Sequence, residues 1–123
     1  MKLLLTDDDS FLLDMYAVKF VAAGYEVVAV KDGEAALAVL REGATFDVIL
    51  LDMVMPGMSG VELLRTITKE HLGGDTCKYI VLSNQGERPD IAAAKEAGAI
   101  GYIVKAELMP SEVVEKVTHM VKG

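Results

Sequence analysis

The sequence predicts a doubly wound α/β fold, with five parallel strands in one sheet and five helices covering both of its faces. Short apolar stretches alternate with longer segments of helical periodicity, and turn residues separate them. The stretch Val48–Leu51 is apolar and β-favouring at every position, and a loop with proline and glycine follows it. Such a stretch is typical of a central strand covered on both faces. Repeated strand–helix units need right-handed crossovers, which place helices on each face of a parallel sheet.

The first strand–helix unit begins almost at the amino terminus. Its strand, Leu3–Thr6, stops at a run of acidic residues, in which Asp9 or Ser10 is placed to cap the following helix. That helix is expected to end at Gly24, because glycine readily adopts the left-handed conformation found after helix ends. The residues expected to face inward are Leu12, Leu13, Met15, Tyr16, Phe20 and Val21.

The second and third units follow the same plan. The strand Tyr25–Val30 leads through Asp32-Gly33 into a helix. The central strand Val48–Leu51 leads into a helix that starts with a capping box, in which Ser59 precedes a glutamate by three residues. This helix is expected to end at Gly73-Gly74. The inward residues expected on the two helices are Ala36, Leu37, Leu40, Leu63, Leu64 and Ile67.

The last two units complete the predicted sheet. The strand Lys78–Leu82 precedes an alanine-rich helix that Pro89 begins and Gly98 caps. The fifth strand, Ile100–Val104, precedes a final helix over Pro110–Val121. Its expected inward residues are Val113, Val114, Val117 and Val121.

Composition limits the classes of protein that this chain can be. A length of 123 residues fits one domain, residues 1–123, with a sizeable core, and a hydrophobic content of 52% argues against disorder. A net charge of −7 without a lysine and arginine cluster argues against a nucleic-acid surface. Cys77 has no partner for an internal disulfide, which fits a reducing compartment. Neither a signal peptide nor a membrane span is expected, so a cytoplasmic location is predicted.

Polar residues stand at the carboxyl ends of four predicted strands. Asp7 and Asp8 follow the first strand, Asp52 the third, Ser83 the fourth and Lys105 the fifth. In a parallel sheet these ends share one edge, where ligands of open α/β sheets bind. Three carboxylates so close together repel one another, and Mg²⁺, which prefers oxygen ligands, would relieve that repulsion. A divalent cation beside a lysine is a site suited to phosphoryl transfer.

The same residues carry a family resemblance. The segments LLLTDDDS, VILLDMVMPGMSG, VLSN and GYIVKA, in this order, resemble the receiver domain of bacterial two-component response regulators over essentially the whole chain. The resemblance is to single-domain, chemotaxis-regulator-like receivers with a flavodoxin-like fold. It implies a signalling protein that accepts a phosphoryl group on Asp52 from a sensor histidine kinase or phosphotransfer protein. Such a protein would catalyse only its own phosphorylation and dephosphorylation.

The resemblance also implies roles for the other residues. The Mg²⁺ ligands would be Asp7, Asp8, Asp52 and the backbone carbonyl of Val54. Lys105 would pair with a phosphoryl oxygen and Ser83 would hydrogen-bond to another, while Tyr102 would act as an aromatic switch. A phosphoryl group adds roughly −1.5 to −2 of charge and three acceptor oxygens. The switched surface, formed by the fourth helix, fifth strand and fifth helix, would bind a downstream protein.

Two positions depart from the family pattern. Ala106 follows Lys105 where a cis-proline is usual, which leaves the geometry of the lysine loop open. Val54 is apolar at a position that tunes attack of water on the acyl phosphate, so slow or moderate autodephosphorylation is expected.

Three alternatives compete with the receiver interpretation. The D-x-D formed by Asp7 and Asp9 is also found in haloacid-dehalogenase phosphatases, in which Asp7 would be the nucleophile. That class needs an acidic pair after the lysine strand and usually a cap insertion. A flavodoxin-like cofactor binder would need a phosphate-binding loop after the first strand, where three carboxylates would repel the phosphate. A receiver-like interaction module that works without phosphorylation is the third alternative.

Overall fold

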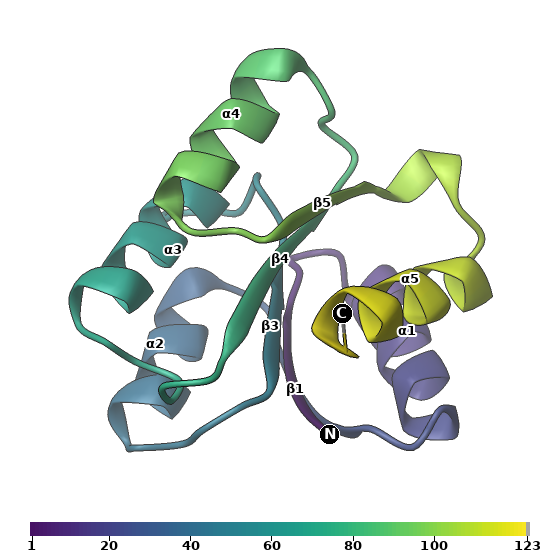
Figure 1. Cartoon of the computed structure of the whole chain (residues 1–123), viewed down its shortest axis with the longest axis horizontal. Coiled ribbons are helices and arrows are strands. Elements are labelled where there is room, and N and C mark those ends of the chain that lie inside the picture. The colour runs from purple at the N-terminus through teal and green to yellow at the C-terminus, as the bar shows by residue number, and fades with distance from the viewer. Residues whose placement is uncertain (123) are drawn as a thin grey trace.

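The computed structural model describes residues 1–122, which form a central sheet with helices on both sides (Figure 1). The strands are β1 (Lys2–Thr6), β2 (Glu26–Val30), β3 (Val48–Leu51), β4 (Lys78–Ser83) and β5 (Gly101–Val104). The helices are α1 (Ser10–Ala22), α2 (Gly33–Arg41), α3 (Gly60–Lys69), α4 (Arg88–Ala97) and α5 (Pro110–Lys122), with a short 3₁₀ turn, η1 (Lys105–Glu107), after β5. The predicted fold class is confirmed.

The sheet is parallel throughout, in the order β2-β1-β3-β4-β5. Because the chain crosses over to form β3 beside β1, it changes direction between these two strands, and the crevice above them is where open α/β sheets bind ligands. Thr6 is in register with Leu51, so the residues after the two strands, Asp7 and Asp52, emerge side by side. The register of the central pair therefore fixes where the site forms.

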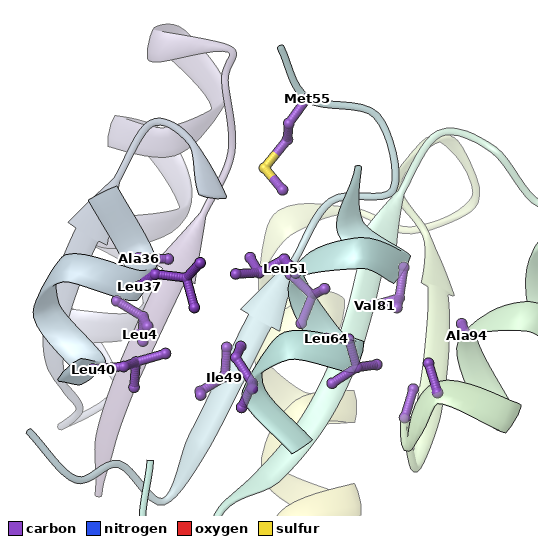
Figure 2. Packing of buried hydrophobic residues seen from close by; sticks show 14 of the residues in the cluster. Leu4, Ala36, Leu37, Leu40, Ile49, Leu51, Met55, Leu64, Val81 and Ala94 are labelled. Atoms are coloured by element: carbon purple, nitrogen blue, oxygen red, sulfur yellow. The ribbon is translucent and has the colours of Figure 1, made fainter. Parts of the chain in front are cut away.

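The core has two halves, one on each face of the sheet. Helices α2, α3 and α4 cover one face, and α1 and α5 cover the other (Figure 1). Alternate strand residues divide between the halves: Leu3 and Leu5 pack with α1 and α5, whereas Leu4 packs with α2 and α3. Figure 2 shows the half covered by α2, α3 and α4, in which Met55 from the loop after β3 points toward the cluster. The strand β3 is fully buried, as expected for a central strand.

Helix ends follow the predicted chemistry in most places. Asp9 caps α1 by accepting the backbone N–H of Leu12 at 3.1 Å, and Ser59 caps α3 by accepting that of Glu62 at 3.2 Å. Gly24 and Gly98 take positive φ values of 96° and 119° after α1 and α4, as predicted.

Two details of the predicted elements are wrong. Helix α3 ends at Lys69, before Gly73-Gly74, because His71 itself takes a left-handed conformation with φ of 55°. Val21 is 58% exposed, since α1 is apolar around most of its circumference and periodicity alone cannot select its inward face. Val121, predicted to face inward, is half-buried and packs against the half of the core that contains α1 and α5. Among residues 1–122, no helix combines the length and apolar character needed to cross a bilayer.

Candidate functional site

The predicted site residues meet at the carboxyl edge of the sheet. Asp7 and Asp8 lie after β1, Asp52 after β3, Ser83 at the end of β4 and Lys105 at the start of η1, and all five line one cavity of about 370 Å³. The predicted juxtaposition is confirmed. Four of the five side chains are buried, whereas that of Asp8 is exposed.

Lys105 joins the first and third strands through two charged hydrogen bonds. Its Nζ donates to Oδ2 of Asp7 at 2.6 Å and to Oδ2 of Asp52 at 2.8 Å. The three residues are 8%, 2% and 8% exposed, respectively, so solvent screens these ion pairs weakly. Lys105 is therefore part of the buried site, unlike a typical solvated surface lysine. The Lys105–Ala106 peptide bond is trans, which settles the geometry that the missing proline left open.

Burial and pairing act on the ionisation of this cluster in opposite directions. Burial raises the pKa of Asp7 above its ordinary value, although the hydrogen bond from Lys105 acts to lower it. Burial also acts to lower the pKa of Lys105, but the hydrogen bonds to Asp52 and Asp7 outweigh it and raise the pKa overall. The lysine thus stays charged, and its charge is what keeps two neighbouring carboxylates compatible with burial.

The three carboxylates are grouped closely enough to share a cation. One oxygen each from Asp7, Asp8 and Asp52 lies within 4.8 Å of the others. Their three negative charges minus the one positive charge of Lys105 leave a local charge of −2, which a divalent cation would neutralise. The donor set is all oxygen, which suits a hard cation, and the exposed Asp8 gives access from solvent. The residues present therefore fit a metal ion.

The second oxygen of Asp52 organises the loop that follows. Oδ1 accepts the backbone N–H of Val54 at 3.3 Å, and Val54 lines the cavity with a side chain that is 53% exposed. Asp7 does the same for its own loop, because its Oδ1 accepts the backbone N–H of Asp9 at 3.0 Å. In both residues one carboxylate oxygen bonds Lys105 and the other stabilises the turn after the strand.

A main-chain connection links the site to the outer edge of the sheet. The Ser83 hydroxyl accepts the backbone N–H of Gln85 at 3.3 Å, and the hydroxyl of Tyr102 donates to the carbonyl of Gln85. Ser83 is buried in the site, whereas Tyr102 lies on the edge strand β5 and is half-buried. The backbone of Gln85 therefore bridges the two predicted switch residues. The sequence does not indicate this bridge, because the bridge uses the backbone of Gln85 and not its side chain.

The fold and the site together define a class of protein. A doubly wound sheet carries a buried carboxylate–lysine cluster at its switch point, with room for a cation and an anionic oxygen. This arrangement is suited to an α/β domain that binds or transfers phosphoryl groups.

The comparisons identify the family. A family model described as the response regulator receiver domain matches residues 3–118. The chain belongs to this family: it is a response regulator receiver domain, and the cluster of Asp7, Asp8 and Asp52 fits the phosphorylation site.

Individual relatives agree with this assignment. The phosphate regulon transcriptional regulatory protein PhoB of Pseudomonas aeruginosa is 33% identical over 120 residues, which are 98% of this chain and 51% of the relative. The DNA-binding response regulator MtrA of Mycobacterium tuberculosis is 29% identical over 116 residues, 94% of this chain and 48% of the relative. The chain thus spans about half the length of these curated relatives.

Solved structures are similar over the whole domain. The chemotaxis protein CheY4 of Vibrio cholerae superimposes with a TM-score of 0.86 at 29% identity, covering 97% of each chain. The receiver domain of the putative response regulator NarL from Mycobacterium tuberculosis also gives 0.86, at 27% identity over 99% of this chain and 96% of that one.

Proposed function

We propose that Asp52 is the phosphoacceptor of this receiver and takes its phosphoryl group from the phosphohistidine of a sensor histidine kinase or phosphotransfer protein. The observation that carries the proposal is the buried Lys105, whose ammonium group contacts Asp52 at 2.8 Å and Asp7 at 2.6 Å. A buried cation fixed on a carboxylate oxygen is placed to stay beside that oxygen when it becomes part of an acyl phosphate.

The transfer exchanges one bond to phosphorus for another. An oxygen of Asp52 bonds the phosphorus while the phosphorus–nitrogen bond of the donor breaks, and the histidine keeps the bonding electrons. Asp7, Asp8, Asp52 and the backbone carbonyl of Val54 would hold Mg²⁺, which supplies charge neutralisation for the phosphoryl oxygens. Lys105 neutralises a second oxygen and the Ser83 hydroxyl donates to a third. The protein catalyses this step and its own dephosphorylation, which the apolar Val54 keeps slow.

Phosphorylation changes the surface at the outer edge of the sheet, beside β5. When the Ser83 hydroxyl turns toward the phosphoryl group, it releases the backbone N–H of Gln85, and the loop and Tyr102 rearrange together. Tyr102 lines a groove of about 280 Å³ between α4 and β5, beside Ile91 and Ile100, which are 38% and 52% exposed. This groove, with α5, is the proposed docking surface for a downstream protein. Residues 1–123 act as one cytoplasmic receiver domain without direct contact to nucleic acid or membrane.

Contacts in the site argue against the rival functions. A haloacid-dehalogenase mechanism with Asp7 as the nucleophile would need the carboxylate of Asp9 free to act as the acid/base. Asp9, the acid/base of that mechanism, caps α1 through Leu12. A receiver-like module that works without phosphorylation would gain no phosphoryl group in the assay described next.

Acetyl phosphate, Mg²⁺ and intact mass spectrometry test the phosphoacceptor. The chain should gain one phosphoryl group, Asp52→Asn should gain none, and chelation of Mg²⁺ should abolish the gain. Asp14→Asn, which alters an exposed carboxylate of α1, is the matched control and should react as the parent does. An adduct on Asp52→Asn, or none on the parent chain, would contradict the assignment.

A further inference from the structure

The backbone of Asp52 is in direct contact with the first residue of α3. Gly60 is buried, and its N–H donates to the carbonyl of Met53 at 2.9 Å. A β-carbon placed on Gly60 would lie 2.0 Å from the carbonyl oxygen of Asp52, 2.8 Å from its carbonyl carbon and 2.9 Å from Cα of Met53. All three atoms are backbone, so no side-chain rotation can make room.

The equivalent position of α2 shows a different environment. Gly33 is also buried, also the first residue of its helix, and also preceded by a side chain that caps the helix. A β-carbon there would lie 3.0 Å from Sδ and 3.2 Å from Cβ of Met58, so the atoms in its way belong to a methionine side chain. A methyl group at Gly33 therefore needs only a small shift of Met58, whereas one at Gly60 must displace the main chain.

The required displacement is about 1 Å or more, because non-bonded carbon and oxygen atoms need roughly 3.2 Å or more of separation. The carbonyl that would move belongs to Asp52, whose carboxylate holds Lys105 at 2.8 Å and the N–H of Val54 at 3.3 Å. Both contacts depend on the orientation of this one backbone segment. A shift of this size is large compared with the tolerance of a reacting geometry.

We propose that Gly60 is a positioning residue for phosphorylation: its missing side chain lets α3 pack against the carbonyl of Asp52 and fixes the direction of the acceptor carboxylate and of the Asp52–Val54 turn. The inference rests on the proposed function of Asp52. Gly60 makes no contact with the phosphoryl group and acts only through the backbone that it holds in place.

The test compares Gly60→Ala with Gly33→Ala and with Ser59→Ala, which removes the α3 cap and controls for general loss of stability. Each variant is phosphorylated with acetyl phosphate at saturating Mg²⁺, and rates are normalised to the folded fraction measured by circular dichroism. Gly60→Ala should lower the maximal rate about 100-fold, leave the apparent Michaelis constant for acetyl phosphate unchanged, and weaken Mg²⁺ binding in calorimetry. The two control variants should stay within about threefold of the parent chain.

Every outcome is decisive. Equal maximal rates for Gly60→Ala and the controls would overturn the inference alone, whereas a parent chain that takes no phosphate would overturn the proposed function itself. If Gly60→Ala is unfolded in buffer, the assay is repeated in sucrose, which favours the folded state. Folding that returns without the maximal rate supports the inference. A chain that stays unfolded in sucrose contradicts it, because the glycine is then required by the fold as a whole.

Discussion

Replacing Lys105 should cost more stability than its position after an edge strand suggests. Lys105→Met keeps most of the side-chain volume and removes the charge that pairs with Asp7 at 2.6 Å and Asp52 at 2.8 Å. Removing one partner of a buried ion pair costs about 3–5 kcal/mol, because a charge is left buried without compensation. The lower end applies here, since the exposed Asp8 marks access of solvent to the same cavity.

Urea unfolding measures this cost. With a slope of roughly 1.5 kcal/mol/M, a loss of about 3 kcal/mol moves the midpoint down by about 2 M. A domain of ordinary stability survives such a loss, so the variant should still fold. Lys31→Met removes an exposed lysine and should change stability by less than about 0.5 kcal/mol.

A double-mutant cycle with Asp7→Asn separates pairing from general disruption. Asp7→Asn removes one of the two buried carboxylates, so the loss on replacing Lys105 should shrink by about 1–3 kcal/mol in that background. Additive losses, or a Lys105→Met variant as stable as Lys31→Met, would refute the view that the lysine compensates the buried carboxylates.

Three further predictions concern the fold. Thr6 is 1% exposed and its hydroxyl has no hydrogen-bond partner within residues 1–122, so Thr6→Val should raise stability by about 1 kcal/mol in urea; a loss would mean that the hydroxyl is satisfied. Phe20→Ala removes a fully buried ring packed edge-on against Tyr25, with ring centroids 5.1 Å apart, and should lower the free energy of unfolding by about 3–5 kcal/mol. Val18→Ala, at an exposed position of α1, should change it little in the same urea unfolding experiment. Burial raises the pKa of the Cys77 thiol to about 12, so its alkylation by iodoacetamide should stay slow at pH 9 and accelerate only toward pH 12. Because folding raises the pKa of this thiol, the contribution of Cys77 to stability is complete below the ordinary thiol pKa and is lost as pH rises toward 12. An alkylation rate profile with its midpoint near pH 9 would show that the thiol is not shielded.

The sheet and its site could be predicted because their signals are local. Val48–Leu51 is apolar at every position, and the polar residue that follows each strand is adjacent in sequence to the element that places it. Parallel strands then bring Asp7, Asp52 and Lys105 together without any knowledge of side-chain packing. The ammonium contacts on both carboxylates follow from this topology and from charge.

Features that depend on packing were not predictable in the same way. Val21 was wrongly assigned to the inward face of α1, because this helix also carries apolar residues, such as Phe11 and Val18, on its exposed side. The role of Gly60 depends on how closely α3 approaches β3, which no residue pattern encodes. The end of α3 at Lys69 depends on His71 adopting a conformation that is uncommon for residues other than glycine.

The bridge from Ser83 to Tyr102 has a consequence for how this protein can diversify. Both of its hydrogen bonds use the peptide groups of Gln85, so the connection survives nearly every replacement of that side chain. Proline is the exception, because it has no N–H to donate to Ser83. The side chain at position 85, which lines the cavity, can therefore change while this hydrogen-bonded connection between Ser83 and Tyr102 stays intact.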